Sequence, residues 1–509
     1  MLSFRVASAV ENNAMSFNRL ANNALWNLTG QLAPLAIALV ALPPLIHALG
    51  VDRYGFLTLA WALVGYAGLF DLGISRAMTR LVAQRLADND RAGARHIGGV
   101  ATTFMLAFGA LSGAVLGGCA SSVVDGWLKV PTALRLEAIN AVWLLAACMP
   151  VVLLTSAYRG YIEAHQSFKA LNMLRVLMGL FTFVGPLCAA WLSPRLEVTV
   201  GAVVAMRVVA AWAHARVADR HCGFRYRFSL PDRDTARRLF ALGGWMSVSN
   251  IVGPLMSSMD RFILGGLVAV EMVAYYATPY DLMGRTMVLP YAVMGVLFPM
   301  MAGLGNNATR VRETYDATIR MLFVCMFPVV FVAFTLGGPF LRIWLGEAFA
   351  RQGTIVLQLL SIGVLANALA QAPANLILAL GQPKWMAVTH LLELPLFLLA
   401  IWYFTLRFGI AGTALAWSLR TILDCAILFT LASHKLGGSD ISAGRALLAA
   451  GFATVLCVAG YSAITDAQRI AVCVLGLAAF AVFAWSVVFT NPDKARILRY
   501  ASGFLRIAG

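Results

Sequence analysis

Charged residues inside apolar runs of membrane-spanning length are the residues of this sequence best suited to bind a ligand or move an ion. Residues 54–86 are almost wholly apolar apart from charges that include Asp71, Arg76 and Arg80, and we expect these three on one helix. A lone charge at bilayer depth costs roughly 2.5–3.5 kcal/mol on insertion scales, so it usually faces protein or water. A guanidinium group can hold a phosphate with two hydrogen bonds. The two arginines therefore either bind an anion or only reach the membrane–water interface.

Arg207 lies near the middle of another expected span and has no acidic residue at helical spacing. An unpaired arginine at that depth is a candidate for substrate handling, unless an acid on another helix pairs with it. Two further arginines have an acid four residues away on the same helix face, in the pairs Asp281–Arg285 and Arg420–Asp424. Such pairs either take part in binding or simply neutralise each other and hold helices together.

Four more ionisable residues fall inside apolar runs. Asp260 and Arg261 are adjacent, so their side chains point in different directions and we expect their partners elsewhere. His390 and Glu393 are three residues apart on one helix face. They either relay protons or only form hydrogen bonds, and we favour hydrogen bonding.

The composition favours a membrane protein over a soluble enzyme. Of the 509 residues, 60% are hydrophobic and only 12% are charged, whereas soluble domains carry about a quarter charged residues. A soluble core could not absorb so much apolar surface. A bilayer needs about 20 apolar residues per helix, and such runs recur along the chain. We expect an all-α polytopic protein with fourteen spans, near 22–49, 54–75, 97–119, 136–158, 171–193, 198–217, 239–267, 272–303, 317–338, 354–380, 385–406, 410–432, 445–464 and 469–490.

A basic segment with seven arginines, residues 215–238, separates six expected spans from the next six. The first half opens with Trp26 and Pro34, and the second opens with Trp245 and Pro254. We therefore expect two six-helix lobes and two C-terminal helices, since repeated lobes commonly enclose a central site with alternating access. The predicted parts are an N-terminal segment 1–21, an N-lobe 22–217, a linker 218–238, a C-lobe 239–434, a final helix pair 435–490 and a tail 491–509.

Membrane topology explains the net charge of +16 better than nucleic-acid binding does. If the loops alternate between the two sides, most of the 39 lysines and arginines fall on the side of the N-terminus. Basic residues favour the cytoplasmic side, so we expect both termini in the cytoplasm. The basic segment 215–238 then acts as a topology anchor that touches anionic lipid headgroups. Its aromatic residues come without a recognisable nucleic-acid-binding fold.

Motifs for enzymatic, metal or cofactor chemistry do not occur in the sequence. The eight cysteines form no CxxC pair, and no Walker loop, GxSxG or HExxH motif is present. The expected outer loops are too short for a catalytic domain. We therefore predict no enzyme activity, no catalytic residues, no metal and no resident cofactor. The N-terminus lacks the apolar core of a signal peptide, and Met15 is an alternative start to Met1.

Several stretches resemble one family. They are LGVDRYGFLTLAWALVGYAGLFDLGISRAMTRLVAQ within 23–86, SMDRFILGGLVAVEMVAYYATPYDLM at 258–283, FLRIWLGEAFA at 340–350, and the segment from LGQPKW to RTILD with its Gly409–Gly412 helix start. They resemble bacterial polysaccharide transporters, the Wzx-type lipid-linked oligosaccharide flippases. These belong to the MOP superfamily, which also holds MATE exporters and lipid II flippases.

The resemblance implies two helical lobes around a central cavity, through which a polyprenyl-diphosphate-linked glycan crosses the bacterial inner membrane. In this interpretation the cationic, substrate-binding residues are Arg76, Arg80, Arg207, Arg285 and Arg420. Those for coupling or gating are Asp71, Asp260, Asp281, Asp424 and Glu393. The driving force is left open, with a proton or a sodium ion as the candidate coupling ion. Membrane lipids are further partners, and contact with a polysaccharide polymerase or assembly proteins is an open question.

Three alternatives remain at the level of sequence. A MATE-like exporter of small cations would need acids in the cavity, whereas the unpaired charges here are mostly basic. A glycosyltransferase or polymerase would need a sizeable outer loop. A structural scaffold for polysaccharide assembly would transport nothing, so a flipping assay separates it from the first interpretation.

Overall fold

The computed structural model describes residues 35–65, 67–226, 229–303, 308–436, 440–463 and 465–495. Within these ranges the secondary structure is helical, apart from one isolated bridge between Lys129 and Ala269. The expectation of an all-α chain is confirmed. The chain divides into two compact units, Met1–Ala274 and Tyr275–Gly509. Trp26, Pro34 and the alternative start at Met15 lie outside the described residues.

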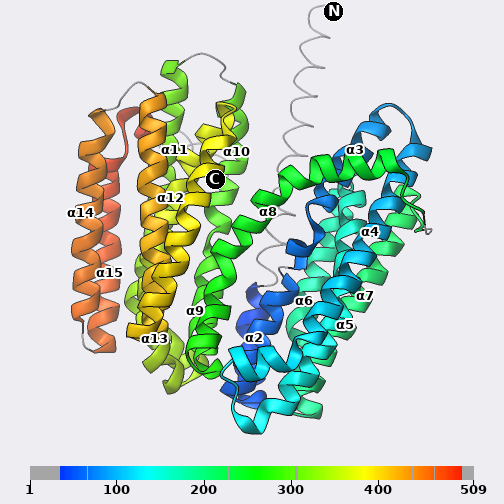
Figure 1. The fold of residues 1–509 in the computed structure, drawn as a ribbon. Coiled ribbons are helices and arrows are strands. Elements are labelled where there is room, and N and C mark those ends of the chain that lie inside the picture. Colours follow the sequence, from blue (N-terminus) through cyan, green and yellow to red (C-terminus); the bar gives the residue numbers. More distant parts are fainter. Residues whose placement is uncertain are drawn as a thin grey trace, which may run out of the picture. The chain divides into compact units, whose positions relative to one another are not determined.

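The first unit consists of helices joined by short turns (Figure 1). After a helix at Leu35–Leu49, its elements are α2 (Val51–Gly65), η1 (Ala67–Asp71), α3 (Ile74–Ala87), α4 (Arg91–Gly118), η2 (Ser122–Trp127), η3 (Thr132–Leu134), α5 (Arg135–Ala164), α6 (Phe168–Leu192), α7 (Leu196–Cys222) and α8 (Arg233–Leu267). Helix α5 packs against both α4 and α7, and α6 packs against α7. Helix α8 packs against α3.

Small residues bring α4 and α5 into close contact. A Cβ atom added at Gly109 would overlap the backbone of Pro150, and one at Gly113 would overlap the carbonyl oxygen of Ala146. Glycines four apart on one face let two membrane helices approach closely, which increases their van der Waals contact. The four-residue spacing of Gly109 and Gly113 therefore determines how these two helices pack.

The second unit begins within α9 (Val270–Thr286). The following elements are α10 (Val288–Gly303), α11 (Ala308–Leu345), α12 (Glu347–Ala379), α13 (Pro383–Lys435), α14 (Asp440–Ser462), α15 (Asp466–Phe483) and η4 (Ala484–Val488). Helix α12 packs against both α11 and α13, and the C-terminal helices α14 and α15 pack against α11 (Figure 1).

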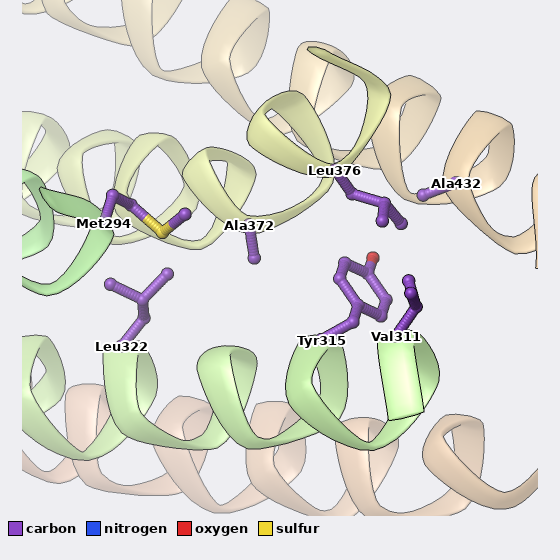
Figure 2. Close-up of a cluster of buried hydrophobic side chains, with 7 residues drawn as sticks. All are labelled: Met294, Val311, Tyr315, Leu322, Ala372, Leu376 and Ala432. Carbon is purple, nitrogen blue, oxygen red and sulfur yellow. The ribbon is translucent and has the colours of Figure 1, made fainter. Parts of the chain in front are cut away.

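Apolar side chains hold the second unit together. Figure 2 shows a buried cluster formed by Met294, Val311, Tyr315, Leu322, Ala372, Leu376 and Ala432, which come from α10, α11, α12 and α13. A second cluster joins α11 to the C-terminal helices through the stacked rings of Phe327 and Phe331, with Phe480 against Phe327. Because the phenylalanines of α11 are four residues apart, they lie along one helix face.

Eight helices in the described ranges are long and apolar enough to cross a membrane, and those at Leu35–Leu49 and Gly451–Ser462 are shorter apolar helices. The expected count of fourteen spans stays a prediction. The expected span 54–75 is not continuous, since α2 ends at Gly65 and α3 starts only at Ile74. The expected span 272–303 divides into α9 and α10. The boundary expected between 406 and 410 coincides with a backbone break at Gly409 inside α13.

Candidate functional site

Asp71 does not lie on the same helix as Arg76 and Arg80, so that prediction is wrong. A left-handed turn precedes α3, in which Leu72 has φ 47° and Gly73 has φ 73°. The buried Asp71 carboxylate accepts a hydrogen bond from the Gly73 N–H at 2.7 Å. Glycine tolerates a positive φ without steric cost, and aspartate commonly bonds to the backbone two residues on. The sequence Asp-Leu-Gly therefore ends one helical segment and starts the next.

Arg76 and Arg80 do share α3, and both side chains are exposed. They are one turn apart, while Ala77, Met78 and Leu81 on the other side of the helix are buried. Arg76 attracts the Asp71 carboxylate electrostatically. The expected basic pair therefore exists, with both guanidinium groups accessible.

Arg207 lies on α7 and its side chain is half-buried. It lines a small cavity between α6 and α7 together with Met178, Phe181 and Thr182 of α6. The cavity volume is about 10 Å³, which is room for about one water molecule. Among the described residues, Arg207 has no acidic partner. A phosphate could reach this guanidinium only if the side chain left the groove or α6 and α7 separated.

Helix α13 is a hairpin whose two arms meet at Gly409, where φ is 58° and ψ is −136°. Contacts between residues on opposite sides of Gly409 show that the two arms pack against each other. The hydroxyl groups of Thr405 and Thr413 are 2.8 Å apart. Farther from the bend, the Nε2 atom of His390 lies 3.5 Å from the Oδ1 atom of Asp424. The two arms therefore run antiparallel and bring residues 34 positions apart into contact.

The hairpin gathers three of the predicted site residues, Glu393, Arg420 and Asp424. Glu393 is 3% exposed, and neither of its carboxyl oxygens has a hydrogen-bond partner among the described residues. The guanidinium of Arg420 lies 5.3 Å from the ring centroid of Phe397 and also attracts Glu393. His390 lies 3.5 Å from Asp424 and also attracts Glu393, the neighbour that its spacing suggested. Buried polar groups are rarely unsatisfied, so this cluster is a candidate site for binding a proton.

The remaining predicted residues lie on α8 and α9. On α8, Asp260 and Arg261 are buried, and an oxygen of Asp260 accepts the Arg261 N–H at 2.8 Å. Both take part in further interactions, and the expectation that their partners lie on other helices stays a prediction. On α9, Asp281 is exposed, Arg285 is half-buried, and the two side chains attract each other.

Comparison with protein families identifies the chain. Residues 47–353 match the model of a family described as polysaccharide biosynthesis protein.

The chain belongs to this polysaccharide biosynthesis family.

Two relatives extend this family assignment. A Shigella flexneri protein assigned as an O-antigen transporter is 31% identical over 409 residues, which cover 80% of this chain and 96% of the relative. A Haloferax volcanii protein assigned as a flippase of low-salt glycan biosynthesis is 24% identical over 242 residues, which cover 46% of this chain and 50% of the relative.

Solved structures share the fold of this polysaccharide biosynthesis protein. The lipid II flippase MurJ in an inward closed conformation has a TM-score of 0.71 at 12% identity, covering 92% of this chain and 100% of MurJ. An inward-facing multidrug resistance MATE transporter of the MOP superfamily has a TM-score of 0.65 at 13% identity. The match covers 80% of this chain and 98% of that transporter. The expectation of a MATE-like and MurJ-like multi-pass membrane fold is confirmed.

Two features of this family member were not expected from its sequence. Arg53 of α2 makes a bidentate ion pair with Glu137 of α5, with distances of 2.9 and 2.8 Å. A pocket with arginine and aromatic lining lies at the end of α7, beside the segment Gly223–Tyr226. The alternating arginines and aromatic residues of GFRYRF were the sequence signal for this pocket. The signal was interpreted as a topology anchor, because basic loops next to membrane spans commonly have that role.

Proposed function

We propose that the chain is a flippase that moves a polyprenyl-diphosphate-linked oligosaccharide across the bacterial inner membrane for surface or exopolysaccharide biosynthesis. The observation that carries this proposal is the match to the O-antigen transporter over 96% of that relative. The likeness to MurJ supports a fold suited to such a step. We expect both termini in the cytoplasm, and partners that include membrane lipids and polysaccharide assembly proteins.

The physical task of such a protein is to replace water around a charged headgroup. Burying an ionised group without compensating contacts is prohibitively costly, whereas the polyprenyl tail is stable in lipid. Cationic side chains in a central cavity with alternating access would provide those contacts, and no covalent bond need be made or broken. The relatives are assigned as transporters and flippases.

The proposed roles follow the position and accessibility of each arginine. Arg76 and Arg80 are exposed and would receive the diphosphate first. Arg207 would hold it deeper, after its side chain leaves the groove between α6 and α7. Arg285 and Arg420 would act from the second unit. These roles, together with the lobe boundaries at 217 and 239, remain proposals.

The acidic residues have three proposed roles. Asp71 would orient the turn before α3, and Asp260 and Asp281 would serve gating. The pair Glu393 and Asp424 would carry the coupling proton, because it lies inside a hairpin with unsatisfied carboxyl oxygens.

The test is transport by the purified protein in liposomes that contain a polyprenyl-diphosphate oligosaccharide with a terminal labelled sugar. An added glycosidase removes only the label that faces outward. The proposal predicts that label becomes accessible beyond the initial outer-leaflet fraction only in liposomes that contain the protein. An unchanged accessible fraction, together with accumulation of a cationic dye under a proton gradient, would contradict the proposal and favour a small-cation exporter.

A further inference from the structure

The pocket at the basic end of the first unit has no part in the proposed transport step. Its volume is about 320 Å³, and it is formed by α5, α7 and the segment that follows α7. Two of its lining residues are arginines and four are aromatic. This lining suits a ligand with both an anionic and an apolar part.

The pocket is preformed by the way α7 ends. Gly223 has φ 63°, and the N–H groups of Gly223 and Phe224 bond back to carbonyl oxygens in the last turn of α7. This left-handed ending turns the chain back across the helix. Phe224 is 2% exposed and stacks on Tyr161 with ring centroids 4.1 Å apart. The buried ring therefore fixes the position of Arg225 and Tyr226, which follow it directly.

Two arginines without an acidic partner face this pocket. Arg216 of α7 and Arg225 both line it and are both exposed. The guanidinium of Arg216 lies 5.4 Å from the ring centroid of Trp212, one turn earlier on the same helix. Neither arginine forms an ion pair with any residue in the ranges that the structure describes. Two free guanidinium groups at one pocket are suited to a phosphate. Asp219 also lines the pocket, and its carboxylate could accept hydrogen bonds from hydroxyl groups.

An exposed apolar stripe on α7 leads to this pocket. Val208 is 50% exposed and Trp212 is 61% exposed, and they lie at successive four-residue steps before Arg216. Positions four apart lie on one face of a helix. Exposed tryptophans are frequent at the level of lipid headgroups. Helix α7 is apolar and long enough to span a membrane, so a lipid headgroup can enter the pocket while its own acyl chains stay against this stripe.

We propose that this pocket binds the headgroup of an anionic phospholipid of the phosphatidylglycerol class. The phosphate lies between Arg216 and Arg225, and the glycerol hydroxyls donate to Asp219. The acyl chains follow Val208 and Trp212 toward the centre of the span. This proposal does not depend on the transport proposal, because it uses none of the residues assigned there.

Native mass spectrometry of the purified full-length protein with added phosphatidylglycerol or phosphatidylcholine tests this site. The wild-type protein should retain phosphatidylglycerol preferentially. The double variant Arg216→Gln/Arg225→Gln should retain about tenfold less phosphatidylglycerol than the wild type, since one charge-assisted hydrogen bond to the phosphate already contributes about a factor of ten. Arg220→Gln is the matched control, because Arg220 is an exposed arginine on the same helix that does not line the pocket. Its retention of phosphatidylglycerol should equal that of the wild type.

A second variant separates loss of the site from misfolding. Ala215→Trp fills the pocket and leaves both arginines in place, so it should also reduce phosphatidylglycerol retention. Equal retention by the wild type, Ala215→Trp and a folded double variant would overturn the proposal. Undecaprenyl diphosphate is the competing probe. Displacement of phosphatidylglycerol by an equal amount of this probe, lost in the same variants, would overturn the phospholipid assignment in favour of the transported lipid.

Discussion

Replacement of Gly409 tests whether the hairpin of α13 depends on a backbone conformation that only glycine adopts readily. Its φ of 58° and ψ of −136° lie outside the regions open to other residues. A Cβ atom added there would meet no other atom within 4 Å, so the cost of Gly409→Ala is conformational and not steric. Strained backbone of this kind costs about 1–3 kcal/mol per residue. We therefore expect Gly409→Ala to lower the free energy of unfolding by about 1–3 kcal/mol.

The assay is reversible unfolding in detergent micelles, followed by tryptophan fluorescence, with the free energy of unfolding compared between variants. Gly451→Ala is the matched control, because Gly451 lies inside α14, is exposed, and also has open space around its Cβ position. Alanine is the better helix former, so this control should gain about 0.5–1 kcal/mol. The reasoning is refuted if Gly409→Ala is as stable as the wild type, or if the two variants shift in the same direction.

Other substitutions test single contacts. Glu137→Ala should destabilise the first unit by about 1–3 kcal/mol in chemical unfolding, because the guanidinium of Arg53 loses its bidentate partner; an unchanged midpoint would contradict this. Gly109→Val should lower the thermal unfolding temperature, since its side chain would overlap the backbone of Pro150. Bonds from the N-terminus of α8 and a contact with an imidazole of α4 hold the pKa of Asp232 well below its ordinary value of 3.8. The stability that Asp232 adds is therefore present above about pH 4 and lost as the pH falls further. Asp232→Asn should remove this acid dependence from unfolding curves, and an unaltered pH profile would rule out the contact.

The sequence was sufficient for the architecture because hydrophobic run length and helix-breaking residues are local signals. The apolar runs predicted an all-α membrane fold, and the break near Gly409 was visible as a glycine between two apolar runs. The interruption before α3 was missed. Asp71 and Gly73 fall inside an apolar run of spanning length, and the turn becomes evident only from the positive φ of Leu72 and Gly73.

The partners of the buried charges were harder to predict, because they depend on contacts between helices. Spacing along one helix suggested that Glu393 would accompany His390 and that Arg420 would accompany Asp424. The hairpin also places His390 beside Asp424, across a bend whose register no four-residue pattern encodes. The groove between α6 and α7 that holds Arg207 depends in the same way on how two helices pack.

The measurement that tests the central claim most directly is the rate at which a labelled polyprenyl-diphosphate oligosaccharide changes leaflets in liposomes that contain Arg207→Ala. If a guanidinium within the span replaces water around the diphosphate, loss of this charged donor should slow the transfer about tenfold or more. Arg207→Lys should recover part of the rate, and Arg195→Ala, an arginine that is 68% exposed at the start of α7, should transfer at the wild-type rate. Transfer by Arg207→Ala at the wild-type rate, with equal protein incorporated, would contradict the account.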